Sequence, residues 1–521
     1  MGRADELIRQ LNEKRARLIH PDWNVKAIEK QHSKGKLTAR ERVQKLLDPN
    51  SFVELDLWAG PKRTGYEIDN REIPGDAVIT GYGSIAGRAV CIYAQDFTLA
   101  GGTLGTTHAR KMIKVCKKAL KWKIPLIGLI DSGGVRVQDH VTAGPFDSYV
   151  SMFYLHTMSS GVIPQIAVMM GPCAAGAAYA PILHDFIFMV KDTSYMYVAG
   201  PALTKAVSGV EITDQELGGA KVHATASGCC DVLASNDEDA LEQVREMLSY
   251  LPLNNDEKPP YVTPKDDSNG KAEELIRIIP EKSGTTFDMH EIISRIVDDG
   301  KLFEIKRDFA KNMIVGFARL GGNSVGMVAN NTKHKAGSLD IDAADKEARF
   351  VRFCDAFNIP LIFLVDTPAY LPGKDQEHRG IIRHGAKVLY AVSEATVPKL
   401  TVYVRKAYGG AVSAMCPEPL GSDLLIAWPT AEMALMGIEG AVSILYGKEI
   451  SDSDDPDEMR KKRTNDYMAQ FGEQPYHPAQ YMRIEEIIDP RDTRSILINA
   501  LHMMQHKSEE IPRKKHGNIP L

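Results

Sequence analysis

The chain has few of the features that mark a secreted, metal-binding or membrane-spanning protein. Only seven of its 521 residues are cysteine, only Cys229 and Cys230 adjoin, and no CxxC or CxxH pair occurs. This pattern indicates neither a disulfide framework nor a zinc site, and it favours a reducing, cytoplasmic compartment. No apolar run is long enough to cross a bilayer, and the charged N-terminus lacks the apolar core of a secretory signal. We therefore expect no membrane insertion and no bound metal.

The excess of one sign of charge over the other is also small. The formal net charge is −5, which argues against nucleic acid as the main partner. Hydrophobic residues make up 44% and charged residues 25%, as in an ordinary globular protein. A length of 521 residues is too great for one hydrophobic core and predicts two or more domains.

The most informative feature is an internal repeat. The segment 123–131 (KIPLIGLID) resembles 358–366 (NIPLIFLVD), and 366 minus 131 gives an offset of 235 residues. Gly102-Thr-Leu matches Gly337-Ser-Leu at the same offset, and Lys111 falls on Lys346. Further on, 162–168 matches 396–402 at an offset of 234. A near-constant offset over this distance indicates two copies of one domain.

Each copy has the pattern of an α/β unit. The apolar runs 126–130 and 361–365 predict strands buried on both faces, and amphipathic patterns over 108–123 and 344–358 predict the helices before them. The polar, proline-rich stretch 252–282 has the composition of a linker. We therefore predict domains over 1–255 and 281–521, joined by a linker over 256–280.

Small residues gather after the second strand of each copy. The first cluster is 171–178 (GPCAAGAA) and the second is 406–411 (KAYGGA); at an offset of 234, Ala175 and Gly176 fall on Gly409 and Gly410. A strand, a small-residue turn and a helix expose backbone N–H groups that can stabilise an oxyanion. Tight helix–sheet packing explains one such cluster equally well, but two clusters at matching positions favour two oxyanion sites.

Several segments resemble the propionyl-CoA carboxylase β-subunit family: 131–134 (DSGG), 171–174 (GPCA), 405–411 (RKAYGGA), 427–432 (AWPTAE), 30–42 and 515–521. The resemblance implies two tandem crotonase-like domains (ββα superhelices), the first on the acyl-CoA side and the second on the biotin side. It also implies a homohexamer with active sites shared between subunits. The same family holds transcarboxylase cores and catalytic subunits of methylmalonyl-CoA decarboxylases.

The resemblance implies the role of each cluster. The carboxyl group passes from carboxybiotin to the α-carbon of a short acyl-CoA, propionyl-CoA or acetyl-CoA. N–H groups at Ala175 and Gly176 hold the thioester oxygen, and those at Gly409, Gly410 and Ala411 hold the ureido oxygen of biotin. No side-chain general base is evident at either cluster, so the biotin enolate is expected to take the α-proton. Candidate substrate contacts are Gly133, Gly134, Arg136, Tyr179 and Ser413.

Some of these candidates have simpler interpretations. Arg136 is expected to pair with a local carboxylate, and Tyr179 to pack against its neighbours. Ser413 lies where the family helps to select acyl length. The chain also departs from the family pattern, with Ala175 and Ala369 where glycine is usual and with an unusual segment over 135–147.

Other segments that the complete reaction needs are missing from the sequence. It contains no biotin-accepting Met-Lys-Met and no GxxxxGK[ST] phosphate loop. Biotin and its ATP-driven carboxylation are therefore expected on partners, a biotin carboxyl carrier subunit and a biotin carboxylase. No cysteine quartet marks the zinc-bearing variety of the family.

Four alternatives stay open. A decarboxylase or transcarboxylase subunit would use the same site, because direction depends on the partners. A crotonase-like CoA hydratase would need carboxylates beside the turn, and a serine protease would need a Ser–His–Asp set. A scaffold without activity would keep the repeat alone.

Overall fold

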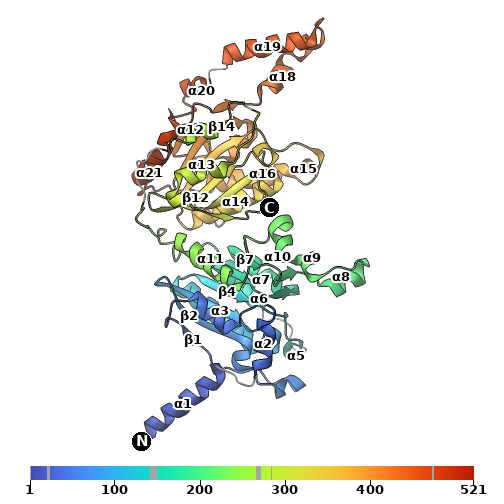
Figure 1. The fold of residues 1–521 in the computed structure, drawn as a ribbon, viewed down its shortest axis with the longest axis vertical. Coiled ribbons are helices and arrows are strands. Elements are labelled where there is room, and N and C mark those ends of the chain that lie inside the picture. The colour runs from blue at the N-terminus through green and yellow to red at the C-terminus, as the bar shows by residue number, and fades with distance from the viewer. Residues whose placement is uncertain (1, 20–23, 141–148, 266–271, 283, 472–473) are drawn as a thin grey trace. The chain divides into compact units, whose positions relative to one another are not determined.

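The computed structural model describes residues 2–19, 24–140, 149–265, 272–282, 284–471 and 474–521. The chain divides into two compact units, of which unit 1 ends at Glu257 and unit 2 begins at Lys258 (Figure 1). The unusual segment 135–147 is described only up to residue 140.

Unit 1 is built on one mixed sheet. Its strands lie in the order β1-β2-β3-β4-β5-β7-β9, and β6 pairs with β8 in a separate ribbon. The strands are β1 (Val53–Leu55), β2 (Val78–Ile85), β3 (Arg88–Gln95), β4 (Leu126–Ile130), β5 (Gln165–Met169), β6 (Pro172–Ala174), β7 (Phe186–Val190), β8 (Tyr195–Tyr197) and β9 (Val232–Ala234). The helices are α1 (Arg3–Ile19), α2 (Val25–His32), α3 (Ala39–Leu46), α4 (Thr106–Trp122), α5 (Val137–His140), α6 (Tyr149–Ser159), α7 (Tyr179–Ile182), α8 (Pro201–Ser208), α9 (Asp214–Gly218), α10 (Ala220–Val222) and α11 (Asp237–Tyr250).

Unit 2 repeats this plan. Its strands lie in the order β10-β11-β12-β13-β14-β15-β17, with β16 paired to β14. The strands are β10 (Leu302–Ile305), β11 (Met313–Leu320), β12 (Asn323–Asn330), β13 (Leu361–Thr367), β14 (Lys399–Tyr408), β15 (Leu424–Ala427), β16 (Glu432–Ala434) and β17 (Glu486–Ile487). The helices are α12 (Leu275–Ile278), α13 (Met289–Ile296), α14 (Ile341–Ala356), α15 (Lys374–His378), α16 (Ile381–Glu394), α17 (Gly409–Ala414), α18 (Ile438–Ser451), α19 (Pro456–Phe471), α20 (Tyr476–Gln480) and α21 (Thr493–Met503).

The same local chemistry forms the same elements in both units. The β2–β3 hairpin turns at Ala86-Gly87 and the β11–β12 hairpin at Gly321-Gly322, and all four residues have positive φ. A two-residue hairpin turn that matches the right-handed twist of its strands can be formed with positive φ at both residues. Helices α4 and α14 are each followed by a left-handed residue, Lys123 or Asn358, before the chain enters β4 or β13. The strands predicted within the repeated IPLI segments, and the helices predicted before them, are confirmed.

Buried lysines show how closely the copies agree. Lys111 donates to the carbonyls of Gly75 and Val78, and Lys346 donates to those of Lys306 and Phe309. Burial lowers the pKa of Lys111 to about 8 and that of Lys346 to about 7. These two residues are the pair that the sequence repeat aligned at an offset of 235. Each lysine ties its α4 or α14 helix to the segment that leads into β2 or β11 of its own unit.

A buried ion cluster closes unit 1 at the end of β4. Asp131 accepts hydrogen bonds from Gln31 (3.0 Å), Lys36 (2.8 Å) and Arg42 (2.9 Å). Arg42 also donates to Asp237 at the start of α11 (2.7 Å), and its side chain is 1% exposed. Asp131 thus joins the N-terminal helices to the sheet. The matching Asp366 of unit 2 pairs instead with Arg405 from β14 (2.9 Å).

We predict that Asp131→Asn destabilises unit 1 by about 3–5 kcal/mol, because it leaves Lys36 and Arg42 buried with too little opposing charge. Urea unfolding followed by hydrogen exchange of β4 measures the loss. Asp192→Asn, at an exposed carboxylate, should change stability by less than about 0.5 kcal/mol. Equal stability of the Asp131→Asn variant and the wild type would contradict this account.

Candidate active site: two strand-to-helix turns

The first turn lies between β6 and α7. Ala175 follows the strand with φ 57, and residues Ala175–Ala178 form one short 3₁₀ turn. Ala175 and Gly176 are exposed, while Ala177 and Ala178 are buried beneath them. A Cβ added to Gly176 would have no atom within 4 Å, so the space beside its α-carbon is open. The first N–H groups of such a turn have no partner within it.

The second turn leads from β14 into α17 and also begins with a left-handed residue. Gly409 follows the strand with φ 59, close to the φ of Ala175. A Cβ on Gly409 would lie 2.9 Å from the carbonyl oxygen of Leu435, so the close backbone approach also requires glycine here. Gly410 is exposed and Ala411 is fully buried. Each turn therefore has an exposed glycine, Gly176 or Gly410, directly after a left-handed residue.

The loop after β4 lies beside the first turn. Gly133 donates to the carbonyl of Gly101 (2.9 Å), and the Gly134 N–H donates to the Ser132 hydroxyl (3.1 Å). Gly134 has φ 99, and a Cβ there would lie 3.8 Å from the Ala174 carbonyl oxygen. Of the two glycines, Gly133 is exposed and Gly134 is buried. The structure therefore brings the 131–134 segment against the first turn.

The other candidate residues lie in different surroundings. Arg136 is 2% exposed; its guanidinium pairs with Asp76 (2.5 Å) and donates to the Thr103 carbonyl (3.0 Å), which fits the local-pair interpretation. Tyr179 follows the first turn and is 51% exposed, with its ring edge-on to Phe153. Ser413 is half-buried in α17, one helical turn beyond Gly409.

Two tyrosines that are not among the candidate substrate contacts lie at the second turn. The ring of Tyr370 lies 3.9 Å from the position of a Cβ on Gly410. The hydroxyl of Tyr408 donates to Glu432, and both border a cavity of about 390 Å³. Burial, followed by Glu432, raises the pKa of Tyr408. The place of Tyr408 directly before Gly409 could have signalled it, whereas Tyr370 lies far from these glycines in the sequence.

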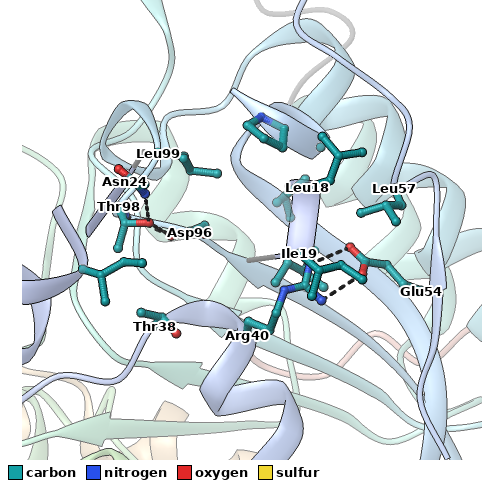
Figure 2. A pocket seen from close by; sticks show the side chains of 15 residues that line it. Leu18, Ile19, Asn24, Thr38, Arg40, Glu54, Leu57, Asp96, Thr98 and Leu99 are labelled. Atoms are coloured by element: carbon teal, nitrogen blue, oxygen red, sulfur yellow. Dashed lines mark hydrogen bonds and ion pairs between the residues drawn. The ribbon is translucent and has the colours of Figure 1, made fainter. Parts of the chain in front are cut away.

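A second, smaller cavity of about 80 Å³ lies in unit 1 (Figure 2). The Arg40 guanidinium donates to both carboxylate oxygens of Glu54 (2.9 and 3.2 Å) on one side of it. On the other side, the Thr98 hydroxyl joins Asn24 and Asp96 (3.1 and 2.6 Å). Burial raises the pKa of Asp96. The residues of the first turn do not line this cavity.

The described part of the chain shows neither a metal centre nor a membrane-spanning helix. Among those residues, no group of three or more histidines, cysteines, aspartates or glutamates is arranged to hold a metal ion. None of the helices formed by the described residues has the length and apolar character needed to cross a membrane.

Comparisons with known proteins give consistent results. The family profile described as carboxyl transferase domain matches residues 30–519. The chain is 48% identical to the propionyl-CoA carboxylase carboxyltransferase subunit of Haloferax mediterranei, covering 99% of each chain. It is also 48% identical to methylmalonyl-CoA decarboxylase subunit alpha of Veillonella parvula, covering 100% of each.

The transcarboxylase 12S crystal structure, a hexamer with methylmalonyl-CoA bound, matches with a TM-score of 0.95 and 44% identity, covering 100% of this chain and 99% of that one. Together with the repeated sheet order, this likeness confirms the fold as two tandem crotonase-like domains from an internal duplication. The matched profile, the relatives at 48% identity and the shared fold agree that this chain is an enzyme of the carboxyl transferase family.

Proposed function

We propose that the chain is the carboxyltransferase subunit of a biotin-dependent acyl-CoA carboxylase. It would transfer a carboxyl group from carboxybiotin, carried on a separate subunit, to the α-carbon of propionyl-CoA or acetyl-CoA. The observation that carries this proposal is the pair of matching turns, with φ 57 at Ala175 and φ 59 at Gly409. Its partners would be a biotin carboxylase and a biotin carboxyl carrier subunit, in the cytoplasm.

The two turns supply what the reaction needs, because negative charge develops at two separate oxygens. In unit 1, N–H groups at Ala175 and Gly176 would stabilise the thioester oxygen as the α-carbon loses its proton. In unit 2, those at Gly409, Gly410 and Ala411 would stabilise the ureido oxygen when the carboxyl group leaves. A fixed N–H donor of this kind typically contributes about 3–4 kcal/mol of transition-state stabilisation.

A decarboxylase or transcarboxylase subunit is the strongest second candidate. The decarboxylase relative of Veillonella parvula is as similar to this chain as the carboxylase relative of Haloferax mediterranei, each at 48% identity. Both reactions would use the same pair of turns. We propose that the partner subunits set the direction of carboxyl transfer. Incubation with carboxylated carrier and propionyl-CoA measures the forward direction, and incubation with methylmalonyl-CoA and empty carrier measures the reverse.

A homohexamer with shared active sites is part of the proposal. Apolar residues stay exposed at matching places of the two units: Val198 (63%) and Val207 (81%) beside and on α8, and Leu435 (81%) and Ile444 (70%) beside and on α18. Helix α8 extends from the body of unit 1, and α18 and α19 extend from that of unit 2 (Figure 1). Large exposed apolar side chains of this kind mark association surfaces. A second copy of the chain is the proposed occupant.

Replacing Gly410 or Gly176 by proline should abolish carboxyl transfer, because proline has no N–H to donate. Steady-state transfer from carboxylated carrier to propionyl-CoA measures the loss, which should be at least about 100-fold. The matched controls are Gly410→Ala and Gly176→Ala, which keep the N–H; a Cβ meets only Tyr370 at 3.9 Å at Gly410 and no atom within 4 Å at Gly176. A folded proline variant with normal turnover would exclude that turn from the reaction.

Replacing Ala175 by glycine should stabilise unit 1 by about 1 kcal/mol, because a left-handed alanine is strained and glycine is not. Turnover should persist, since the N–H remains. Thermal unfolding measures the shift. Ala177→Gly, at a buried alanine of the same turn, should instead lower stability, and a fall for both variants would show that Ala175 carries no strain.

Replacing Ser413 by isoleucine should penalise propionyl-CoA more than acetyl-CoA. The two substrates differ by one methylene, worth only about 1–3 kcal/mol in an apolar pocket, so a modest change of volume can reverse the preference. The ratio of the two kcat/KM values measures the effect, with Ser413→Ala as the small control. A ratio that stays constant would leave the segment 135–147, of which 141–147 lie outside the described residues, as the remaining candidate for acyl selection.

A further inference from the structure

The strand that leads into the second turn is held on both sides along its last residues. On one side, Asp366 forms an ion pair with Arg405 (2.9 Å) and accepts a hydrogen bond from the N–H of Lys406 (3.1 Å). On the other side, β15 pairs with residues 400–403 of β14, and the separate short strand β16 pairs with residues 406–408. The end of β14 therefore has a neighbour of its own, β16, directly before the turn begins.

A side-chain hydrogen bond joins these two short stretches of strand. Tyr408 is the last residue of β14, directly precedes the left-handed Gly409 and is 7% exposed. Its hydroxyl donates to the carboxylate of Glu432, the first residue of β16. In the register of the two strands, Glu432 stands opposite Lys406, so the bond runs diagonally between them. A diagonal bond resists sliding of one strand along the other.

The chain that follows β16 packs on the turn itself. A Cβ on Gly409 would lie 2.9 Å from the carbonyl oxygen of Leu435, and a Cβ on Gly437 would lie 3.8 Å from the ring of Tyr408. The Leu435 side chain is 81% exposed, so this residue meets the turn through its backbone. The position of that backbone follows from the position of β16. Movement of β16 along β14 would therefore move the backbone that lies against Gly409.

Other bonds hold β16 in the fold without Glu432. The side chain of Gln474 accepts a hydrogen bond from the N–H of Met433 (3.1 Å) and donates to the carbonyl of the same residue (3.0 Å). Just before β16, the Thr430 hydroxyl donates to the carbonyl of Val404 (2.7 Å). Loss of the bond between Tyr408 and Glu432 should therefore loosen the alignment at the turn and leave unit 2 folded.

Unit 1 has the same pair of strands without this bond. There β6 leads into the first turn and β8 pairs with it, with Ala174 opposite Tyr197. Ala174 directly precedes the left-handed Ala175, as Tyr408 precedes Gly409, but its methyl group cannot form a hydrogen bond. The tyrosine–carboxylate bond of this region, from Tyr197 to Asp214 (2.7 Å), joins β8 to α9 instead. The bond between the entering strand and its neighbour therefore distinguishes the second turn from the first.

We propose that Tyr408 and Glu432 are positioning residues of the second turn. Their hydrogen bond fixes the end of β14 against β16 and thereby the direction in which Gly409 leads the chain into α17. The N–H groups that would hold the ureido oxygen of biotin are thus in place before the carboxyl group leaves. Both side chains act through the backbone of the turn. This inference rests on the proposed function.

The first test removes one hydroxyl. Tyr408→Phe should lower kcat for transfer from carboxylated carrier to propionyl-CoA about tenfold or more, because misplaced donors stabilise less of the charge in the transition state. The KM for propionyl-CoA should stay within about twofold. The matched control is Tyr390→Phe, which removes a hydroxyl that donates to Glu394 on α16 of the same unit (3.3 Å) and should leave kcat within about twofold.

Substitutions of the acid separate the hydrogen bond from other effects. Glu432→Gln keeps an acceptor oxygen and should stay within about threefold of the wild-type kcat, whereas Glu432→Met keeps the length without that oxygen and should match Tyr408→Phe. The double variant of Tyr408→Phe and Glu432→Met should be no slower than either single variant. A wild-type kcat in Tyr408→Phe, a Gln variant as slow as the Met variant, or effects that multiply would each overturn the proposal.

Hydrogen exchange gives a readout that is independent of activity. In Tyr408→Phe and Glu432→Met, amides of a peptide spanning 406–415 should exchange about fivefold faster or more, while a peptide spanning 172–183, at the first turn, keeps its wild-type rate. Unchanged exchange at the second turn would overturn the proposal. If exchange rises as expected but the wild type shows no carrier-dependent transfer, the proposed function fails, and the positioning of the turn by Tyr408 and Glu432 stands.

Discussion

The architecture depends on a backbone constraint that occurs twice, a left-handed residue directly after a strand. Ala175 and Gly409 have φ 57 and 59, and each is followed by an exposed glycine, Gly176 or Gly410. Because backbone N–H groups are rigid, they stabilise negative charge without reorganising during the reaction. The proposed chemistry therefore depends on the backbone conformation of the two turns more than on any reactive side chain.

Each turn is held by a different support. In unit 1, Asp131 joins Gln31, Lys36 and Arg42 at the end of β4, next to the loop that contacts the first turn. In unit 2, the matching Asp366 pairs with Arg405, from the strand that leads into the second turn. The duplicated fold was thus kept while the surroundings of each turn diverged, as two different substrates would require.

The sequence predicted the repeat, the strands around the IPLI segments and the family, because a constant offset and period-specific apolar patterns survive in residue types alone. It also located the small-residue turns. It could not show that Ala175 is left-handed, since alanine carries no signal for positive φ. It gave Tyr370 no role, because Tyr370 lies far from Gly410 in the chain and meets the second turn only through tertiary packing. The domain boundaries and the individual site residues stay predictions.

Mixing two inactive variants tests the central claim most directly, namely that one turn serves acyl-CoA, the other serves biotin, and neighbouring subunits combine them. Gly176→Pro and Gly410→Pro chains, each inactive alone, would be unfolded and refolded together in equal amounts. If each active site combines unit 1 of one chain with unit 2 of another, about a quarter of the sites regain both intact turns, and transfer activity returns in that proportion. No recovery in mixed oligomers of verified composition would contradict the account.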